Sequence, residues 1–222
     1  MTTSRPATTF SAVVFDLDGT LVDSSEDIAD ALNHAIAVVS DRRVTPSAVV
    51  AAFGEGPRVL VEKCLQSIGL TPSAAQVDRV LADYSARYAA YPVEKTKLLD
   101  TAAAVLPVLH GRGVAIGVCT NKLTLIARAL IDRLGLAPVV GAVIGCDATA
   151  HPKPDPRHVT ETVVALGADA TDALYVGDTN IDQVAAAAAG MPYAHVAWGH
   201  EGVPADFRIE SFDDLLTIVR AN

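Results

Sequence analysis

Five short runs of apolar residues restrict the fold of this chain more than any other feature of its sequence. The runs are continuous rather than alternating, which is typical of strands that are covered on both faces of a sheet. Between the later runs, apolar residues recur every three or four positions, as they do along one face of a helix. The runs occupy residues 12–15, 114–118, 142–144, 173–176 and 193–196. This alternation of strand and helix predicts an α/β fold with a parallel sheet and right-handed crossovers.

One long stretch interrupts the alternation. From about Ser24 to Pro92 we find no convincing strand pattern, and apolar residues recur there at helical spacing. Prolines and glycines divide the stretch into short helices. So long a helical segment between the first and second strands predicts an inserted helical unit rather than a crossover. We expect this unit to span residues 23–96 and the α/β core to be formed by residues 1–22 and 97–222.

The composition argues against two classes of binding partner. The chain of 222 residues has a formal net charge of −9 and a pI near 5.0, whereas a protein that binds nucleic acid needs a basic face. The charge does not argue against a small anionic substrate, because a metal ion or one lysine reverses the field locally. The mean hydropathy is +0.32, but the charge-free runs within 133–147 and 182–201 are too short or too interrupted to cross a membrane. We therefore expect neither nucleic acid nor a membrane as partner.

The N-terminus and the cysteines predict the compartment. Residues 1–10 are polar and lack the apolar stretch of a secretory signal. Cys64, Cys119 and Cys146 are odd in number and widely spaced, which favours reduced, buried thiols over disulfides or a zinc site. The histidines show no spacing typical of metal ligands. These features predict a cytoplasmic protein.

The first group of chemically active residues follows the first apolar run. Residues 16–20 read Asp-Leu-Asp-Gly-Thr, so Asp16 is delivered to the carboxyl edge of the sheet, where parallel sheets bind ligands. Asp-Gly between apolar residues is also a strong turn signal, and a turn is compatible with an acidic site. A calcium loop fits poorly, because Leu21 stands where that loop needs glycine.

A second acidic pair, Asp178 and Asp182, follows the fourth apolar run. The two side chains share one face of a helix that begins there, and helix capping is a sufficient explanation for either one alone. Together with Asp16 and Asp18 at the same edge, they would repel strongly unless a cation with oxygen ligands lies among them. Mg²⁺ is the natural candidate for that cation.

Two further motifs lie at strand ends. Thr120, Asn121 and Lys122 follow the second run, where a hydroxyl and free N–H groups ahead of a helix form a phosphate cradle. Lys153 lies among three alternating prolines that restrict its orientation. Each motif alone has an ordinary explanation, a helix cap for the first and a solvated lysine in a proline-rich turn for the second.

In this order, the four motifs resemble those of the haloacid dehalogenase-like hydrolase superfamily. The order is Asp-x-Asp-Gly-Thr, a strand that ends in Thr-Asn, a lysine, and Gly-Asp-x-x-x-Asp. The resemblance covers essentially the whole chain, and residues 15–24, 120–122 and 176–178 are most similar to phosphoglycolate phosphatases and their close relatives. It implies a Rossmann-like core with an inserted all-helical cap of the C1 type.

The resemblance also implies roles in phosphoryl transfer. Asp16 would attack phosphorus and become an aspartyl-phosphate. Asp18 would protonate the leaving oxygen and later take a proton from the attacking water. Thr120 and the Asn121 N–H would hold phosphoryl oxygens, and Lys153 would offset their negative charge.

The implied metal site is acidic. Mg²⁺ would be bound by Asp16, by the backbone carbonyl of Asp18 and by Asp178. Asp182 would be either a further ligand or a partner of Lys153.

These features predict a Mg²⁺-dependent phosphatase of a small phosphorylated metabolite, with the conversion of 2-phosphoglycolate to glycolate and phosphate as the favoured reaction. In the cap, Arg58 is a candidate for meeting a substrate carboxylate, although a solvated arginine is the more ordinary interpretation.

A sugar-phosphate mutase of the β-phosphoglucomutase kind and an inorganic pyrophosphatase would use the same core. A metal-free dehalogenase has no use for Asp18 or a phosphate cradle, and an inactive scaffold is disfavoured because no motif is missing. The sequence leaves monomer and homodimer open.

Overall fold

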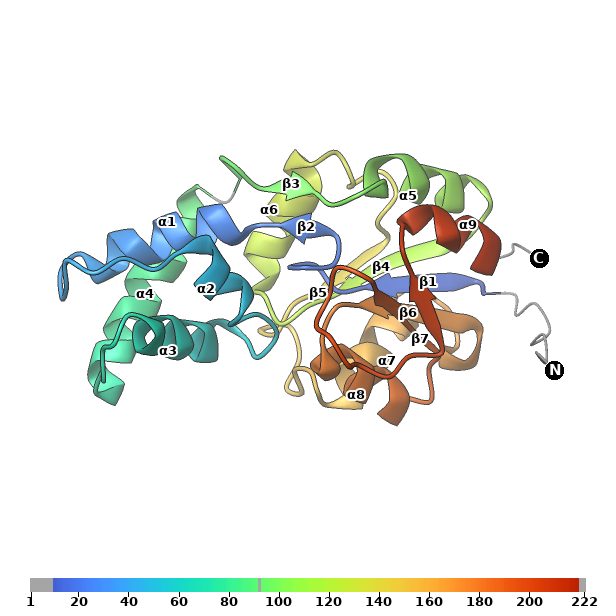
Figure 1. Ribbon diagram of the computed structural model, residues 1–222. Helices are drawn as coiled ribbons and strands as arrows, with labels where there is room; N and C mark the ends of the chain where they lie inside the picture. The colour runs from blue at the N-terminus through green and yellow to red at the C-terminus, as the bar shows by residue number, and fades with distance from the viewer. Residues whose placement is uncertain (1–9, 92, 220–222) are drawn as a thin grey trace.

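The computed structural model describes residues 10–91 and 93–219 (Figure 1). Residues 1–9 of the polar N-terminus and Pro92, the end of the expected helical stretch, lie outside the described residues. In chain order the elements are β1 (Ala12–Phe15), β2 (Val22–Asp23), α1 (Ser25–Ile36), α2 (Pro46–Val50), α3 (Pro57–Ser67), α4 (Ala74–Ala90), β3 (Lys97–Leu98), α5 (Ala102–Gly111), β4 (Ala115–Cys119), α6 (Thr124–Arg133), β5 (Ala142–Ile144), α7 (Pro156–Ala165), the 3-10 turn η1 (Ala170–Asp172), β6 (Ala173–Gly177), α8 (Asn180–Ala188), β7 (Tyr193–Val196), β8 (Phe207–Ile209), the 3-10 turn η2 (Phe212–Asp214) and α9 (Leu215–Ile218).

Within the described residues, six strands form a parallel sheet in the order β5-β4-β1-β6-β7-β8. All five apolar runs form strands of this sheet, so the predicted α/β fold is confirmed. β1 lies inside the sheet, where Phe15 pairs with Val118 of β4 and with Val176 of β6. Because parallel strands end at the same edge, the residues that follow β4, β1 and β6 lie side by side.

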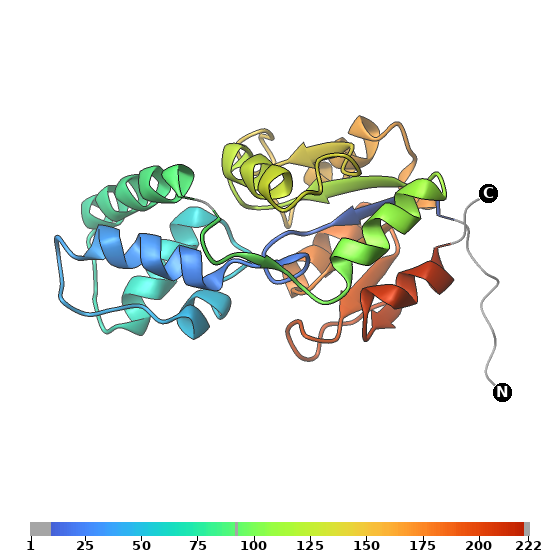
Figure 2. The same ribbon diagram turned by 90° about the horizontal axis from the view of Figure 1, so that it is seen from above.

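Different helices cover the two faces of the sheet (Figure 2). Successive side chains of β1 point to opposite faces, so Ala12 and Val14 pack in one apolar cluster with Val159 and Val163 of α7. Phe15 belongs to the other cluster, on the face of α5, α6 and α9. This burial on both faces explains why the strands are continuous apolar runs.

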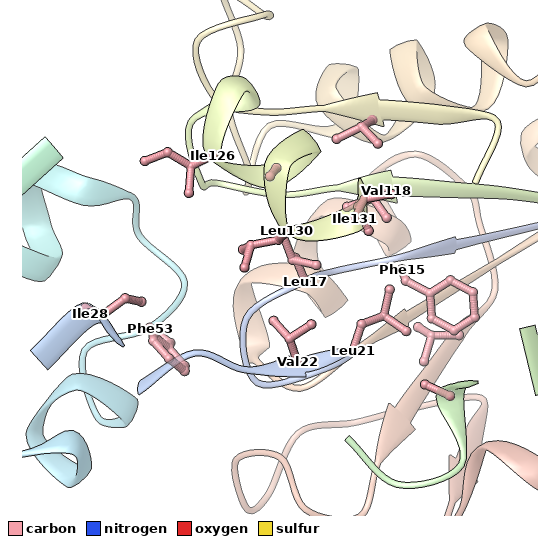
Figure 3. Packing of buried hydrophobic residues seen from close by; sticks show 14 of the residues in the cluster. Phe15, Leu17, Leu21, Val22, Ile28, Phe53, Val118, Ile126, Leu130 and Ile131 are labelled. Atoms are coloured by element: carbon pink, nitrogen blue, oxygen red, sulfur yellow. The ribbon is translucent and has the colours of Figure 1, made fainter. Parts of the chain in front are cut away.

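The helices α1 to α4 lie beside the sheet, between β2 and β3 in the chain (Figures 1 and 2). The longest of them, α4, begins with a capping box in which Ser73 and Gln76 satisfy each other's backbone N–H groups. One cluster of buried apolar side chains extends from β1 through Val22 into this helical unit, where it includes Ile28 and Phe53 (Figure 3). The expected domain bounds stay a prediction.

The sequence patterns do not predict three short strands. β2 and β3 are antiparallel partners of two residues each, too short to show a periodicity. β8 adds a half-exposed edge to the sheet beside β7. The cysteine prediction needs one correction, because Cys146 is only partly buried, although all three cysteines are free thiols. None of the described helices is long and apolar enough to cross a membrane.

Candidate active site

The carboxyl ends of neighbouring strands bring most of the predicted site residues together. Asp16 follows β1 directly, Thr120 and Asn121 follow β4, and Asp178 follows β6. Lys153 reaches the same edge from the loop between β5 and α7. Each of the five is buried. The parallel topology therefore assembles groups that are far apart in the sequence.

Lys153 is held by three partners. Its Nζ lies 3.0 Å from Asp16 Oδ1, 2.6 Å from Asp182 Oδ1 and 2.8 Å from the hydroxyl of Tyr175. The contacts with Asp182 and Tyr175 are hydrogen bonds, and the contact with Asp16 is an ion pair. Burial opposes the charge of Lys153, but the attraction of Asp16 and Asp182 outweighs it and raises the pKa of the lysine. Lys153 is therefore a fixed cation beside Asp16.

Two residues that sequence reasoning missed support this lysine. The Tyr175 hydroxyl donates a hydrogen bond to Cys119 O at 3.0 Å, which fixes its direction. His158 Nδ1 accepts from the backbone N–H of Lys153 at 3.2 Å, and His158 Nε2 lies 3.1 Å from Ile144 O. A neutral ring with its proton on Nε2 satisfies both contacts. Burial, with a contribution from the charge of Lys153, lowers the pKa of His158 to about 4. The one feature of the sequence that could have indicated either residue is Tyr175 itself, a tyrosine in an otherwise aliphatic strand.

The carboxylates of Asp16, Asp178 and Asp182 form a buried acidic cluster, in which one oxygen of each lies within 4.8 Å of the others. Burial raises the pKa of Asp16 to about 6, although Lys153 opposes the rise. Burial also raises the pKa of Asp178 well above its ordinary value, and the negative charges of Asp182 and Asp16 add to the effect. The anionic forms of Asp16 and Asp178 are thus disfavoured unless more positive charge is present.

This cluster fits a divalent cation that prefers oxygen ligands, such as Mg²⁺. Within the described residues, Asp16 Oδ1 makes no hydrogen bond and only the ion pair with Lys153. Asp182 differs, because Oδ1 is taken by Lys153 and Oδ2 by the N–H and hydroxyl of Thr179. Of the two predicted alternatives for Asp182, this geometry favours the partner of Lys153.

A glycine and a tryptophan shape the turn that carries the first aspartates. Gly19 has φ +83°, and a Cβ at this position would lie 2.4 Å from Asp178 Oδ2, so a larger residue does not fit. Trp198 Nε1 donates to Gly19 O at 3.1 Å, and its ring packs edge-on against Phe212. The N–H of His200 donates to Asp178 O at 2.8 Å. The segment after β7 thus encloses both acidic turns.

The side chain of Asp18 turns away from the acidic cluster toward Lys122. Lys122 Nζ lies 2.8 Å from each carboxylate oxygen of Asp18, and the Ser24 hydroxyl donates to Asp18 Oδ1. The ammonium also lies 4.6 Å from the ring centroid of Tyr88 in α4. Lys122 belongs to the predicted Thr-Asn-Lys motif, but the sequence assigned it no role, because its partner is far away in the chain.

Thr120 and Asn121 present donors at the end of β4. The Thr120 hydroxyl oxygen accepts the N–H of Lys122 at 3.2 Å, and its own hydrogen has no acceptor in the part of the chain that the structure describes. The side-chain amide of Asn121 donates to Gly54 O at 2.6 Å and to Lys153 O at 2.8 Å. Asn121 therefore connects the loop before α3 with the lysine loop.

A pocket lies between the core and the helical unit. Its core side is polar, and its side toward the helices is mostly apolar. The residues that line it are Asp16, Asp18, Ile28, Phe53, Gly54, Gly56, Pro57, Leu60, Tyr84, Thr120, Asn121, Lys122, Leu123 and Ile126. The pocket thus joins Asp16, Asp18, Thr120 and Asn121 to an apolar wall, whereas Lys153 and Asp178 lie behind its described lining.

Comparison with known proteins agrees with this geometry. The family model described as haloacid dehalogenase-like hydrolase matches residues 13–196. The chain belongs to this family. The match includes every strand-end residue described above, so the resemblance predicted from the four motifs is confirmed.

Several curated relatives of this hydrolase have the same name. The chain is 38% identical to the phosphoglycolate phosphatase of Rhodospirillum rubrum, over 93% of this chain and 88% of the relative. It is 36% identical to the phosphoglycolate phosphatase of Caulobacter vibrioides, over 91% and 88%. A crystal structure of a predicted phosphoglycolate phosphatase from Haemophilus somnus has a TM-score of 0.85 at 24% identity, and covers 94% of this chain and 97% of its own. That structure shows the shared fold.

Arg58 lies apart from the other predicted site residues of this hydrolase. Its guanidinium contacts Asp78 at 2.6 Å and Glu62 at 3.9 Å, and its side chain is 46% exposed. Arg58 is not among the described residues that line the pocket. In this arrangement it contributes to the surface of the helical unit.

Proposed function

We propose that this hydrolase is a Mg²⁺-dependent phosphatase that converts 2-phosphoglycolate to glycolate and phosphate. The observation that carries the proposal is the buried contact of Asp16 with Lys153, 3.0 Å between Oδ1 and Nζ, beside the donors of Thr120 and Asn121. A carboxylate fixed next to a cation and to free donors suits attack on a phosphoryl group. The 38% and 36% identical relatives named phosphoglycolate phosphatase support the choice of substrate.

The side chains divide the reaction into two displacements. Asp16 attacks phosphorus, the bond from phosphorus to the bridging oxygen breaks, and the leaving glycolate oxygen takes a proton from Asp18. Asp18 then accepts a proton from a water molecule that attacks the aspartyl-phosphate, which releases phosphate and restores Asp16. Throughout, the Thr120 hydroxyl and the Asn121 backbone N–H donate to the phosphoryl oxygens.

Charge is the main obstacle in this pocket, because the substrate and Asp16 are both anionic. Lys153 offsets part of the charge from its fixed position. Asp16 and Asp178, with the backbone carbonyl of Asp18, would hold Mg²⁺, and the ion would supply further positive charge next to the transferring group. The helical unit would exclude bulk water from the closed pocket.

The proposal is tested by phosphate release from a panel of esters, with Mg²⁺ and with EDTA. The panel contains 2-phosphoglycolate, inorganic pyrophosphate, β-glucose 1-phosphate, a nucleoside monophosphate and p-nitrophenyl phosphate. We expect kcat/KM for 2-phosphoglycolate to exceed the others by about 100-fold or more, because a polar group aligned for one substrate discriminates on this scale. We also expect EDTA to abolish release.

The control is Asp16→Asn, which keeps the shape of the side chain but removes the nucleophile. We expect the fold to be unchanged by circular dichroism and turnover to be lost. A flat profile across the panel would contradict the substrate assignment, and retention of most activity in Asp16→Asn would contradict the mechanism.

A further inference from the structure

Lys122 lines the pocket, but the proposed reaction steps assign it no role. It is the one cationic side chain among the described residues that line the pocket. Its side chain is only 5% exposed, and its Nζ lies between the Asp18 carboxylate and the Tyr88 ring. A buried lysine needs compensation for its desolvation, and Asp18 and the Tyr88 ring supply it here, so the charge is held at the wall of the pocket.

Its distance from Asp18 places Lys122 next to the leaving group. In the proposed reaction, Asp18 exchanges a proton with the bridging oxygen, which requires about 2.6–3.2 Å between those two atoms. Lys122 Nζ lies 2.8 Å from both oxygens of Asp18. An atom attached a few bonds beyond the bridging oxygen is therefore within hydrogen-bonding reach of Nζ.

The donors of Lys122 are not all used. Asp18 takes two of them, and an ammonium has three. The apolar side of the pocket, which includes Phe53 and Leu60, offers no other positive charge to an anionic leaving group. A single remaining donor and a single charge suit one carboxylate better than a second phosphoryl dianion, which needs several donors.

We propose that Lys122 determines specificity by binding a carboxylate located one carbon from the bridging oxygen of the substrate. This inference rests on the proposed function and assigns its substrate preference to a core residue instead of Arg58 in the helical unit. Lys122 would contact Asp18 and the substrate carboxylate at the same time, and so align the leaving oxygen with its proton donor.

The test compares 2-phosphoglycolate with 2-phosphoglycolamide. The two substrates have the same phosphoryl group, but the second has an uncharged amide in place of the carboxylate. The ratio of their kcat/KM values is measured in the wild type, in Lys122→Met and in Lys63→Met. Lys63 is a matched control, because it is a lysine of the helical unit that pairs with Glu55 and is 41% exposed. The ratio is taken within each protein, so a change in the folded fraction cancels, as does any displacement of Asp18 that slows both substrates equally.

We expect the wild type and Lys63→Met to prefer the acid by about 10- to 100-fold, the usual range for one hydrogen bond to a charged group. In Lys122→Met the ratio should fall to within about threefold of one. An unchanged ratio in Lys122→Met, or a wild-type ratio near one with rapid hydrolysis of both substrates, would overturn the inference and leave the phosphatase assignment standing. No phosphate release from either substrate by the wild type would overturn the proposed function itself, and this inference with it.

Discussion

Lys153 and Asp182 form an ion pair with 2.6 Å between Nζ and Oδ1, and each side chain is only 1% exposed. A lone charge at this depth would carry a desolvation penalty of several kcal/mol. The opposite charge of each side chain offsets this penalty for the other. The same ammonium lies 3.0 Å from Asp16. Asp182, and not the substrate, therefore positions the cation beside the proposed nucleophile.

Lys153→Ala should lower kcat by about 10²–10³-fold, because it removes a preorganised charge that faces the transferring group. It should also lower the free energy of unfolding by about 3–5 kcal/mol, because Asp182 is left buried without its partner. Steady-state kinetics and urea denaturation measure the two effects. A rise in KM with kcat unchanged would contradict the role assigned to Lys153.

Mg²⁺ should stabilise the folded protein independently of turnover. A ligand that binds only the native state raises the free energy of unfolding by about 2.7 kcal/mol at a concentration 100 times its Kd. We expect the Tm of the wild type to rise with added MgCl₂, and the rise to be much smaller in Asp178→Asn, which removes one carboxylate of the cluster. NaCl at matched ionic strength is the control. An equal rise in both proteins would place the ion elsewhere.

The stability of the protein should fall between pH 6.5 and pH 4 partly because of His158. Its folded pKa of about 4 lies below the ordinary value of 6.5, so the unfolded chain binds a proton in this interval that the folded chain does not. The stabilisation is therefore complete above pH 6.5 and is lost as the pH falls to about 4. It amounts to about 3 kcal/mol.

The matched variant for this prediction is His158→Gln, in which the amide can make the same two hydrogen bonds but does not titrate. Urea denaturation at several pH values should give a shallower loss of stability for the variant than for the wild type. Two parallel curves would show that His158 is not buried in its neutral form.

Gly19→Ala should damage both stability and activity. The added methyl group would lie 2.4 Å from Asp178 Oδ2, and φ at this position is +83°. Such strain costs about 1–3 kcal/mol, and its relief would move either the turn or Asp178. Gly113, which precedes β4 at the opposite edge of the sheet, also has positive φ but open space around it, so Gly113→Ala should lower Tm without a comparable loss of kcat.

The sequence predicts the fold and the motif residues because both depend on local patterns. Each buried strand is a continuous apolar run, and Asp16, Thr120 and Asp178 directly follow such runs, so the parallel topology alone brings them together. β2 and β3 escape prediction because a two-residue ladder carries no periodicity.

The supporting contacts of the site are not local, and the sequence does not predict them. Lys122 and Asp18 meet across 104 positions of the chain, and Tyr175 lies within an apolar run that conceals the direction of its hydroxyl. Arg58 is a candidate from the sequence because its charge suits a substrate carboxylate. Only the three-dimensional arrangement reveals that Asp78 already neutralises it at the surface.

The ladder between β2 and β3 has a consequence for how such a molecule can be altered. Val22 pairs with Leu98 and Asp23 with Lys97, so the chain leaves and re-enters the core through two adjacent, hydrogen-bonded strands. The whole segment between them could be exchanged for a module of another size without rethreading the sheet, provided that the new module again covers Val22 and the apolar residues beside it. The ladder is thus a natural graft point, at which the wall around the leaving group can be redesigned while the phosphoryl-transfer edge keeps its register.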